Sequence, residues 1–270
     1  MNPQSSPTPG EPTVLAEKQG HVLILTLNRP HRLNAWNDDM DQRYFELLDM
    51  AEADPDVRAI VVTGAGRGFC AGADMEDLRE ASDTEDLQAP ERARPRSFPL
   101  TISKPLIAAI NGAAAGLGLV EALYCDFRFT TPEAKFTTAF VRRGLIAEYG
   151  IAWLLPRLVG VSNALDLLLS GRVITGEQAG RLGLVDRVVG ADDLLAAAVE
   201  YASELATYSS PNSMGVIKKQ IYRSMEIDFD TAAREADQLM LESFRHSDAC
   251  EGVRSYLEKR LPEFEPLVTR

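Results

Sequence analysis

Cysteine and histidine are scarce in this chain, with three of each among 270 residues. The cysteines are Cys70, Cys125 and Cys250, and neither they nor the histidines have the spacing of a zinc site or a CxxC motif. An odd, sparse set of cysteines is typical of a reducing compartment. We therefore expect no bound metal ion and a cytoplasmic location, with Cys70 and Cys125 as small core residues rather than nucleophiles.

Positive charge and long apolar runs are also lacking. The formal net charge is −12, which argues against a nucleic-acid surface. No apolar run stands out at the ~20 residues that a membrane span needs. The sequence has no P-loop, and Phe69 stands where a dinucleotide-binding fingerprint needs a third glycine or alanine. We expect no nucleic-acid partner, no membrane partner and no bound dinucleotide.

The order of the predicted elements indicates an α/β fold. Short apolar runs at 21–28, 57–63 and 105–110 predict strands, because they are rich in β-branched residues and end at turn residues. Helical spacing at 38–53 and a buried apolar segment at 116–125 predict helices between and after them. Strands that alternate with helices are typical of a sheet with crossover connections.

The later part of the chain has a different character. Thr175 to Gln178 fits a capping box, and Ser210-Pro211 fits the start of a helix. Further helices are expected at 191–208, 230–246 and 248–260. We therefore divide the chain into a disordered tail, an α/β core that contains a surface loop at 82–97, and a helical C-terminal oligomerisation region. Their bounds are 1–12, 13–190 and 191–270.

Two glycine-rich loops are the most informative feature, at 69–74 and 111–118. Each follows a predicted buried strand and leads into a helix. Glycine lets backbone approach a ligand closely, and the start of a helix has unpaired N–H groups. Two such loops together fit an oxyanion hole, in which two amides bind one oxygen. The same glycines also fit tight turns and close helix packing.

These loops, followed by Cys125-Asp126, resemble the signature of the crotonase (enoyl-CoA hydratase/isomerase) superfamily. The similarity extends over nearly the whole chain after the first dozen residues, including 29–34, 155–160 and 175–179. The resemblance implies a crotonase-like ββα spiral core with a C-terminal helical trimerisation region, and a homotrimer or hexamer. It also implies an acyl-CoA substrate, with coenzyme A as part of the substrate and no separate cofactor. The implied oxyanion hole consists of the N–H groups of Ala73 and Leu117.

The resemblance leaves the acid or base open. Hydratases of this family use two glutamates, and those positions fall on Val120 and Phe140, which transfer no proton. Glu121 is one residue away from the first position, but one helical step rotates a side chain by about 100°. We expect Glu121 to be a paired carboxylate in the core or at an interface.

A different carboxylate matches another branch of the family. The segment 143–150 resembles the stretch of Δ3,Δ2-enoyl-CoA isomerases and related ring-opening isomerases in which the catalytic carboxylate aligns with Glu148. The resemblance therefore favours isomerisation of 3-enoyl-CoA to 2-enoyl-CoA, with Glu148 as general base. Glu148 also fits a charge in the first turn of a helix. An enoyl-CoA hydratase and a non-catalytic acyl-CoA-binding protein remain alternatives.

The nucleotide end of coenzyme A needs cationic and backbone partners. The resemblance places several candidates near it, with the last supplied by a neighbouring subunit: Arg29, Arg32, Ala71, Asp74 and Lys259. Arg67 and Arg260 lie close to these in the sequence and are further candidates. Each charged residue here also fits an ordinary surface position.

Overall fold

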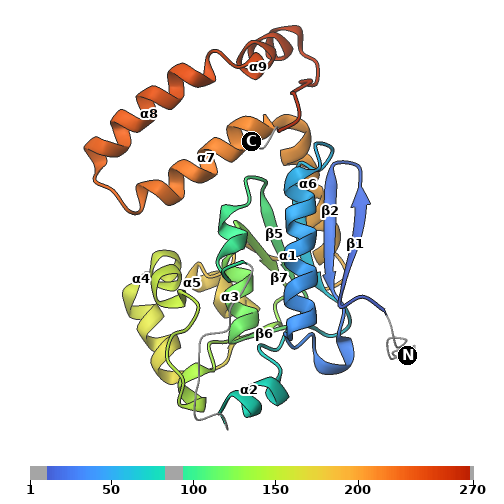
Figure 1. Ribbon diagram of the computed structural model, residues 1–270, viewed down its shortest axis with the longest axis vertical. Coiled ribbons are helices and arrows are strands. Elements are labelled where there is room, and N and C mark those ends of the chain that lie inside the picture. The colour runs from blue at the N-terminus through green and yellow to red at the C-terminus, as the bar shows by residue number, and fades with distance from the viewer. Residues whose placement is uncertain (1–10, 83–93, 268–270) are drawn as a thin grey trace.

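Two mixed sheets form the body of the protein in the computed structural model, which describes residues 11–82 and 94–267 (Figure 1). One sheet has the order β1-β2-β3-β5-β7-β10 and the other the order β4-β6-β8-β9. Neighbouring strands run parallel except in the pairs β1/β2 and β8/β9. The strands are β1 (Val14–Gln19), β2 (Val22–Leu27), β3 (Ala59–Gly64), β4 (Gly68–Cys70), β5 (Leu106–Ile110), β6 (Ala113–Ala115), β7 (Phe127–Thr130), β8 (Lys135–Thr137), β9 (Ile174–Thr175) and β10 (Arg187–Val188).

Helices cover the larger sheet on both faces, and a helical arm extends from one end of the body (Figure 1). Three of the helical segments described, η1, η2 and η3, are short 3-10 turns in the connections between other elements. The helices are η1 (Pro30–Arg32), α1 (Asp38–Ala53), α2 (Met75–Ser82), η2 (Phe98–Thr101), α3 (Leu117–Leu123), η3 (Phe140–Arg143), α4 (Ile151–Ser170), α5 (Gly176–Leu182), α6 (Leu194–Tyr208), α7 (Pro211–Ser224), α8 (Phe229–Ser243) and α9 (Ser247–Glu258).

The central strands are buried on both faces, and alternate side chains belong to different parts of the core. In β3, Ile60 and Val62 pack on the side of α1 and α3, whereas Ala59 and Val61 pack against α6. This alternation follows from the two-residue period of a strand. A strand covered on both faces reads as a continuous apolar run, which is why β3 and β5 were predictable from the sequence.

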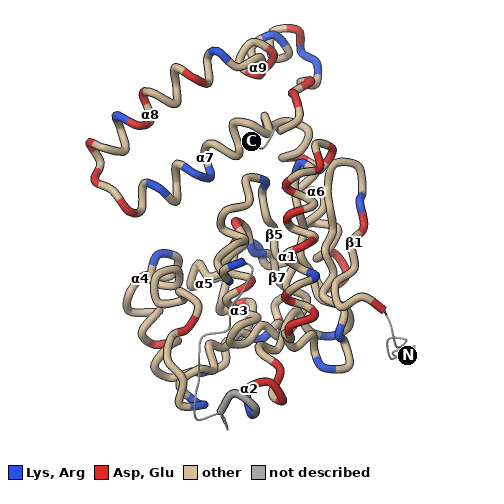
Figure 2. Tube along the Cα trace, in the orientation of Figure 1, with Lys and Arg blue, Asp and Glu red and all other residues tan. Residues whose placement is uncertain are grey.

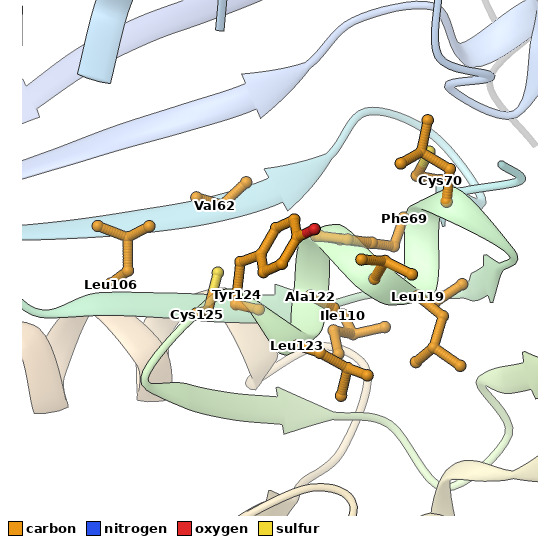
Figure 3. Packing of buried hydrophobic residues seen from close by; sticks show 14 of the residues in the cluster. Val62, Phe69, Cys70, Leu106, Ile110, Leu119, Ala122, Leu123, Tyr124 and Cys125 are labelled. Carbon is orange, nitrogen blue, oxygen red and sulfur yellow. The ribbon is translucent and has the colours of Figure 1, made fainter. Parts of the chain in front are cut away.

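Helix α3 lies unusually close to β4. A Cβ atom built on Gly118 would come within 2.2 Å of the carbonyl oxygen of Cys70. Figure 3 shows the apolar side chains that surround this helix, among them Phe69, Cys70, Leu119 and Tyr124. This close approach requires glycine at position 118. As a result, the N-terminus of α3 lies against the end of β4.

Most predicted elements are present at nearly the expected bounds. The capping box at Thr175 is confirmed, as Thr175 accepts from the N–H of Gln178 and the Gln178 side chain bonds back to Thr175. The sequence analysis missed β1, β4, β6, β9 and β10. β4 and β6 are three residues each, too short to show a strand period, and they lie inside the two glycine loops.

Parts of the expected domain division fall where the structure describes nothing. Most of the predicted tail at 1–12 and most of the predicted loop at 82–97 lie outside the described residues. The helical C-terminal region is present as α6 to α9. α6 packs on β3 and β5 of the core, so only α7, α8 and α9 form the arm.

The expectation of no membrane-length apolar segment is wrong for α4. This helix has 20 residues and a mean hydropathy of 1.3 in its most apolar window, a third of which is buried in the protein. Gly160 interrupts it with a non-helical conformation (φ 78°, ψ 160°). Pro156 does not end the helix, although it removes one backbone donor. Length and composition are the only membrane-like properties that α4 shows.

We predict that Gly118→Ala lowers the free energy of unfolding by about 3 kcal/mol, because overpacking against a backbone carbonyl outweighs the better helix propensity of alanine. Urea unfolding measures this change. Gly190→Ala is the matched control, since Gly190 is exposed and the added Cβ would meet only the Asp193 side chain, at 3.4 Å. A Gly118→Ala variant as stable as the control would contradict the close approach.

Candidate active site

Parallel pairing of β4 with β6 brings the ends of the two glycine loops together. Gly68 pairs with Ala113 and Cys70 with Ala114. The carboxyl ends of parallel neighbours lie at the same edge of a sheet, so the residues that follow the two strands meet there. A Cβ atom built on Gly72 would lie 2.8 Å from the oxygen of Ala115 and 3.8 Å from the nitrogen of Leu117. The structure thus brings the first loop against the start of α3, as expected for an oxyanion hole.

The N–H group of Ala73 points away from Trp36, the residue with which Ala73 is paired. Ala73 forms an isolated parallel bridge with Trp36. The N–H of Trp36 donates to the oxygen of Gly72 (2.8 Å), and the N–H of Asp74 donates to the oxygen of Trp36 (2.9 Å). Because the flanking residues make these bonds, the amide of Ala73 faces the opposite side. It donates to no acceptor within residues 11–82 and 94–267.

Leu117 is the first residue of α3, where backbone N–H groups have no partner inside the helix. The preceding residue, Gly116, has φ 51° and ψ −119° and provides no side-chain cap. The amide of Leu117 therefore also lacks an acceptor in the described part of the chain. Two free amides at one sheet edge can bind a single carbonyl oxygen.

Glu148 lies in the loop between η3 and α4, two residues before Gly150, the N-cap of α4. The first turn of α4 contains no acidic residue, so the alternative interpretation of Glu148 as a first-turn charge does not hold. Glu148 is half-buried. Burial raises the pKa of this carboxyl above its ordinary value, and a hydrogen bond with the Tyr149 side chain partly lowers it. A raised pKa suits a group that accepts and returns a proton.

Hydrocarbon side chains fill the two positions onto which the resemblance places the hydratase glutamates. Val120 is fully buried in α3, and Phe140 is buried at the start of η3. Glu121 is 3% exposed, and its carboxylate lies 3.9 Å from Nη1 of Arg96. The structure therefore places Glu121 as a buried, paired carboxylate, in agreement with the expectation.

A cation between two aromatic rings links the oxyanion loop to the Glu148 loop. The guanidinium carbon of Arg96 lies 5.7 Å from the ring centroid of Trp36 and 5.8 Å from that of Tyr149. Trp36 is the bridge partner of Ala73, and Tyr149 follows Glu148 in sequence. Arg96 also forms an ion pair with Asp41. No motif marks Arg96 or Tyr149 in the sequence, because their partners are 25 to 60 positions away in the chain.

Arg29 and Asp74, both predicted to bind coenzyme A, bind each other. Nη2 of Arg29 lies 3.0 Å from Oδ2 of Asp74, and Nη1 donates to the oxygen of Ala35 (2.5 Å). Both side chains are largely buried. This pair supports the turn that carries Ala73. The amide of Ala71 donates to the oxygen of Leu33 (3.0 Å).

The remaining candidates for the nucleotide end do not gather in one place. Arg32 is exposed and pairs with Glu76 at 3.1 Å, beside the turn of Asp74. Arg67 is exposed immediately before β4. Lys259 ends α9 at the far end of the molecule from α2 (Figure 1), and Arg260 pairs with Glu251 and Glu258. Within one chain, Lys259 and Arg260 are therefore remote from the glycine loops.

The thiols near the site are not suited to nucleophilic chemistry. Burial raises the pKa of Cys70 and of Cys125 to about 12, so both stay protonated at neutral pH. No group of three or more metal-ligating side chains is found among the residues the structure describes. What remains is a pair of amide donors at the sheet edge and the carboxylate of Glu148 in a loop that Arg96 connects to this edge through the rings of Trp36 and Tyr149.

Comparison with known proteins gives a consistent result. A family model described as enoyl-CoA hydratase/isomerase matches residues 17–266. The chain is 37% identical over 257 residues to the 1,2-epoxyphenylacetyl-CoA isomerase of Escherichia coli, covering 93% of this chain and 97% of that protein. An enoyl-CoA hydratase structure from Polaromonas sp. JS666 superposes with a TM-score of 0.87 at 31% identity, covering 93% and 99% of the two chains.

A second structure, an enoyl-CoA hydratase from Mycobacterium marinum, is 48% identical, with a TM-score of 0.69 and coverage of 80% and 100%. These neighbours confirm the predicted α/β fold. The Escherichia coli relative is named an isomerase and the two structures are named hydratases, so these names do not decide between the two reactions.

We predict that Asp74→Asn lowers the free energy of unfolding by about 2 kcal/mol at pH 7, because it breaks a largely buried pair. Burial raises the pKa of Asp74, but the N–H of Glu76 and the Arg29 guanidinium lower it more, so the net shift is downward. Because the pKa of Asp74 is lowered in the folded state, its charge stabilises the fold at pH values above the pKa of an unfolded aspartate, about 3.9. That stability is lost as the pH falls through the lower folded pKa. The difference between variant and wild type should therefore shrink toward pH 3.

Urea unfolding at pH 7 and pH 3 measures this dependence. Asp192→Asn, at an exposed position, is the control and should show no difference at either pH. An equal loss for Asp74→Asn at both pH values would mean that its charge contributes nothing.

Proposed function

Because the chain belongs to the enoyl-CoA hydratase/isomerase family, we propose that it isomerises 3-enoyl-CoA thioesters to 2-enoyl-CoA thioesters with Glu148 as general base. The observation that carries this proposal is the distribution of carboxylates. Glu148 is half-buried with a raised pKa, whereas Val120 and Phe140, onto which the resemblance places the two hydratase glutamates, are buried hydrocarbon side chains. A relative with 37% identity is named an isomerase of an acyl-CoA, which also supports this reaction.

In this mechanism the thioester oxygen accepts hydrogen bonds from the amides of Ala73 and Leu117. Glu148 removes a proton from C2, and the electron pair of the C–H bond delocalises over the thioester and the C3–C4 double bond. Negative charge on the oxygen is stabilised by the two amides, each worth about 3 kcal/mol in comparable sites. Glu148 then returns the proton at C4, which leaves the double bond between C2 and C3. One carboxylate suffices because the same group is first base and then acid.

Hydration is the second candidate, because structures with 31% and 48% identity are named enoyl-CoA hydratases. Adding water across C2 and C3 needs a group that deprotonates water and a proton for C2. Glu148 would have to work with another acid. Glu121 is the nearest alternative on α3, but it is buried beside Arg96.

We predict that Glu148→Gln lowers kcat for isomerisation by about a hundredfold or more, because it keeps the shape of the side chain and removes the proton acceptor. Binding of acyl-CoA should change little, since it depends on the amides and the nucleotide contacts. Conversion of 3-enoyl-CoA, followed by the absorbance of the conjugated product, measures the first effect. The rise in melting temperature with acetyl-CoA measures the second.

Glu121→Gln is the control variant. When it is assayed well below its melting temperature, its kcat should be nearly that of the wild type. Both variants are also assayed for hydration of 2-enoyl-CoA. Loss of hydration in Glu121→Gln, with full activity in Glu148→Gln, would replace the proposal by a hydratase built around α3. Binding of acetyl-CoA with neither activity would indicate a non-catalytic acyl-CoA-binding protein.

We also propose that the protein is a homotrimer or hexamer, assembled through the helical arm. Large apolar side chains are exposed on the arm, among them Phe229 (84% exposed), Phe244 (69%) and Tyr256 (83%). The charged residues of α7 are all basic, whereas α8 and α9 carry charges of both signs (Figure 2). A mainly apolar cavity of ≈ 400 Å³ lies beside α7, lined by residues such as Leu123, Trp153, Leu154, Leu158, Ile217, Ile221 and Met225. Exposed apolar surface of this kind is typical of a subunit interface.

Light scattering should therefore give three or six times the 29.6 kDa of one chain. Combining Phe229→Glu with Phe244→Glu should lower this mass, because burying the new charges in an interface is unfavourable. Met50→Glu is the matched control, since Met50 is 62% exposed on α1, outside the arm. A monomeric wild type at micromolar concentration would contradict the assembly.

A further inference from the structure

Tyr149 has a backbone conformation that its side chain does not favour. Its φ is 54°, in the left-handed region that bulky residues rarely adopt. The next residue, Gly150, has φ 76° and starts α4 as its N-cap. Two consecutive left-handed residues turn the chain sharply between Glu148 and the helix. Such a turn persists only where surrounding contacts hold it.

Contacts from distant segments in the described part of the chain hold Tyr149. The hydroxyl of Tyr124, at the end of α3, donates to the carbonyl oxygen of Tyr149 at 2.6 Å. The guanidinium of Arg96 lies over the Tyr149 ring, with its carbon 5.8 Å from the ring centroid. Arg96 is in turn fixed by its ion pair with Asp41 and its contact with the Trp36 ring. Backbone and side chain of Tyr149 are thus both restrained by the structure that forms the oxyanion loop and α3.

We propose that Tyr149 is a positioning residue for the base: held by Tyr124 and Arg96, it orients the Glu148 carboxylate toward the substrate. This inference rests on the proposed role of Glu148. The phenol of Tyr149 is hydrogen-bonded to that carboxylate and lowers its pKa, against the larger effect of burial. Tyr149 therefore acts on the direction of the base and on its proton affinity together.

Among residues 11–82 and 94–267, few charged or titratable groups are recorded around this loop. Tyr124 and Glu121 approach from α3, and Arg96 from the segment before η2. The η3 turn contributes Arg142 and Arg143, which are exposed. Tyr124 remains protonated, because burial raises its pKa well above the usual range. Burial is the largest influence on the pKa of Glu148, and the hydrogen bond with the Tyr149 phenol is the second.

Tyr149→Phe tests the proposal, because it keeps the ring under Arg96 and removes only the hydroxyl. A hydrogen bond to a carboxylate favours its charged form, so its loss raises the pKa. The acid limb of the pH profile of kcat should therefore move up by about half a unit to one unit. At the plateau, kcat should fall by about tenfold through poorer orientation, while KM changes less than twofold.

Tyr124→Phe provides a second variant, which leaves the Tyr149 phenol in place. It should lower the plateau kcat severalfold at unchanged KM, because the turn before α4 is then less well held. Tyr201→Phe is the matched control. Tyr201 is a half-buried tyrosine on α6 that packs on Phe127 and Phe129, and its variant should behave as the wild type.

The outcomes separate this inference from the proposed function. If Glu148→Gln abolishes isomerisation but Tyr149→Phe keeps the wild-type pH profile and kcat, the role of Tyr149 is wrong while Glu148 stands. If Tyr149→Phe lowers kcat, raises KM and lowers the melting temperature together, Tyr149 has a packing role only. That result would also overturn the inference. If Glu148→Gln retains activity, the proposed function fails. The carboxyl of Glu148 can then still be titrated by ¹³C NMR, where an unchanged pKa in Tyr149→Phe overturns the inference independently.

Discussion

The close backbone contact between β4, β6 and α3 is the constraint on which the rest of the site depends. α3 approaches the Cys70 carbonyl so closely that only glycine fits at position 118, and Gly72 lies against Ala115 in the same way. Parallel pairing of β4 and β6 then places the amides of Ala73 and Leu117 at one edge. Without these contacts the two loops would be ordinary turns, and their N–H groups would point into solvent separately.

A second layer of interactions fixes this edge relative to Glu148. Arg96 contacts both the ring of Trp36, whose backbone supports Ala73, and the ring of Tyr149, which follows Glu148. Tyr124 connects the end of α3 to the same loop. The carbonyl-binding amides and the carboxylate thus belong to one connected set of contacts. Buried charges are costly unless paired, so the ion pair between Arg96 and Asp41 is a condition for this arrangement.

The charged groups predicted around the nucleotide end show how tertiary contacts change the meaning of a residue. Arg29 and Asp74 both matched a ligand-binding pattern, yet they satisfy each other in a largely buried pair. Lys259 ends α9, far from the glycine loops of its own chain (Figure 1). Sequence position alone does not show whether a charge has a protein partner. The roles of these residues toward coenzyme A stay predictions.

The sequence by itself determined the α/β class, most helix and strand positions, the family and the two loops, because periodicity, caps and glycine spacing act over neighbouring residues. It also showed that Val120 and Phe140 have no titratable group. Only the tertiary structure decided that β4 and β6 pair, that Glu121 is buried beside Arg96, and that Tyr149 is held by Tyr124 and Arg96. These contacts join residues far apart in the chain, and no local pattern encodes them, since they arise from how the whole core packs.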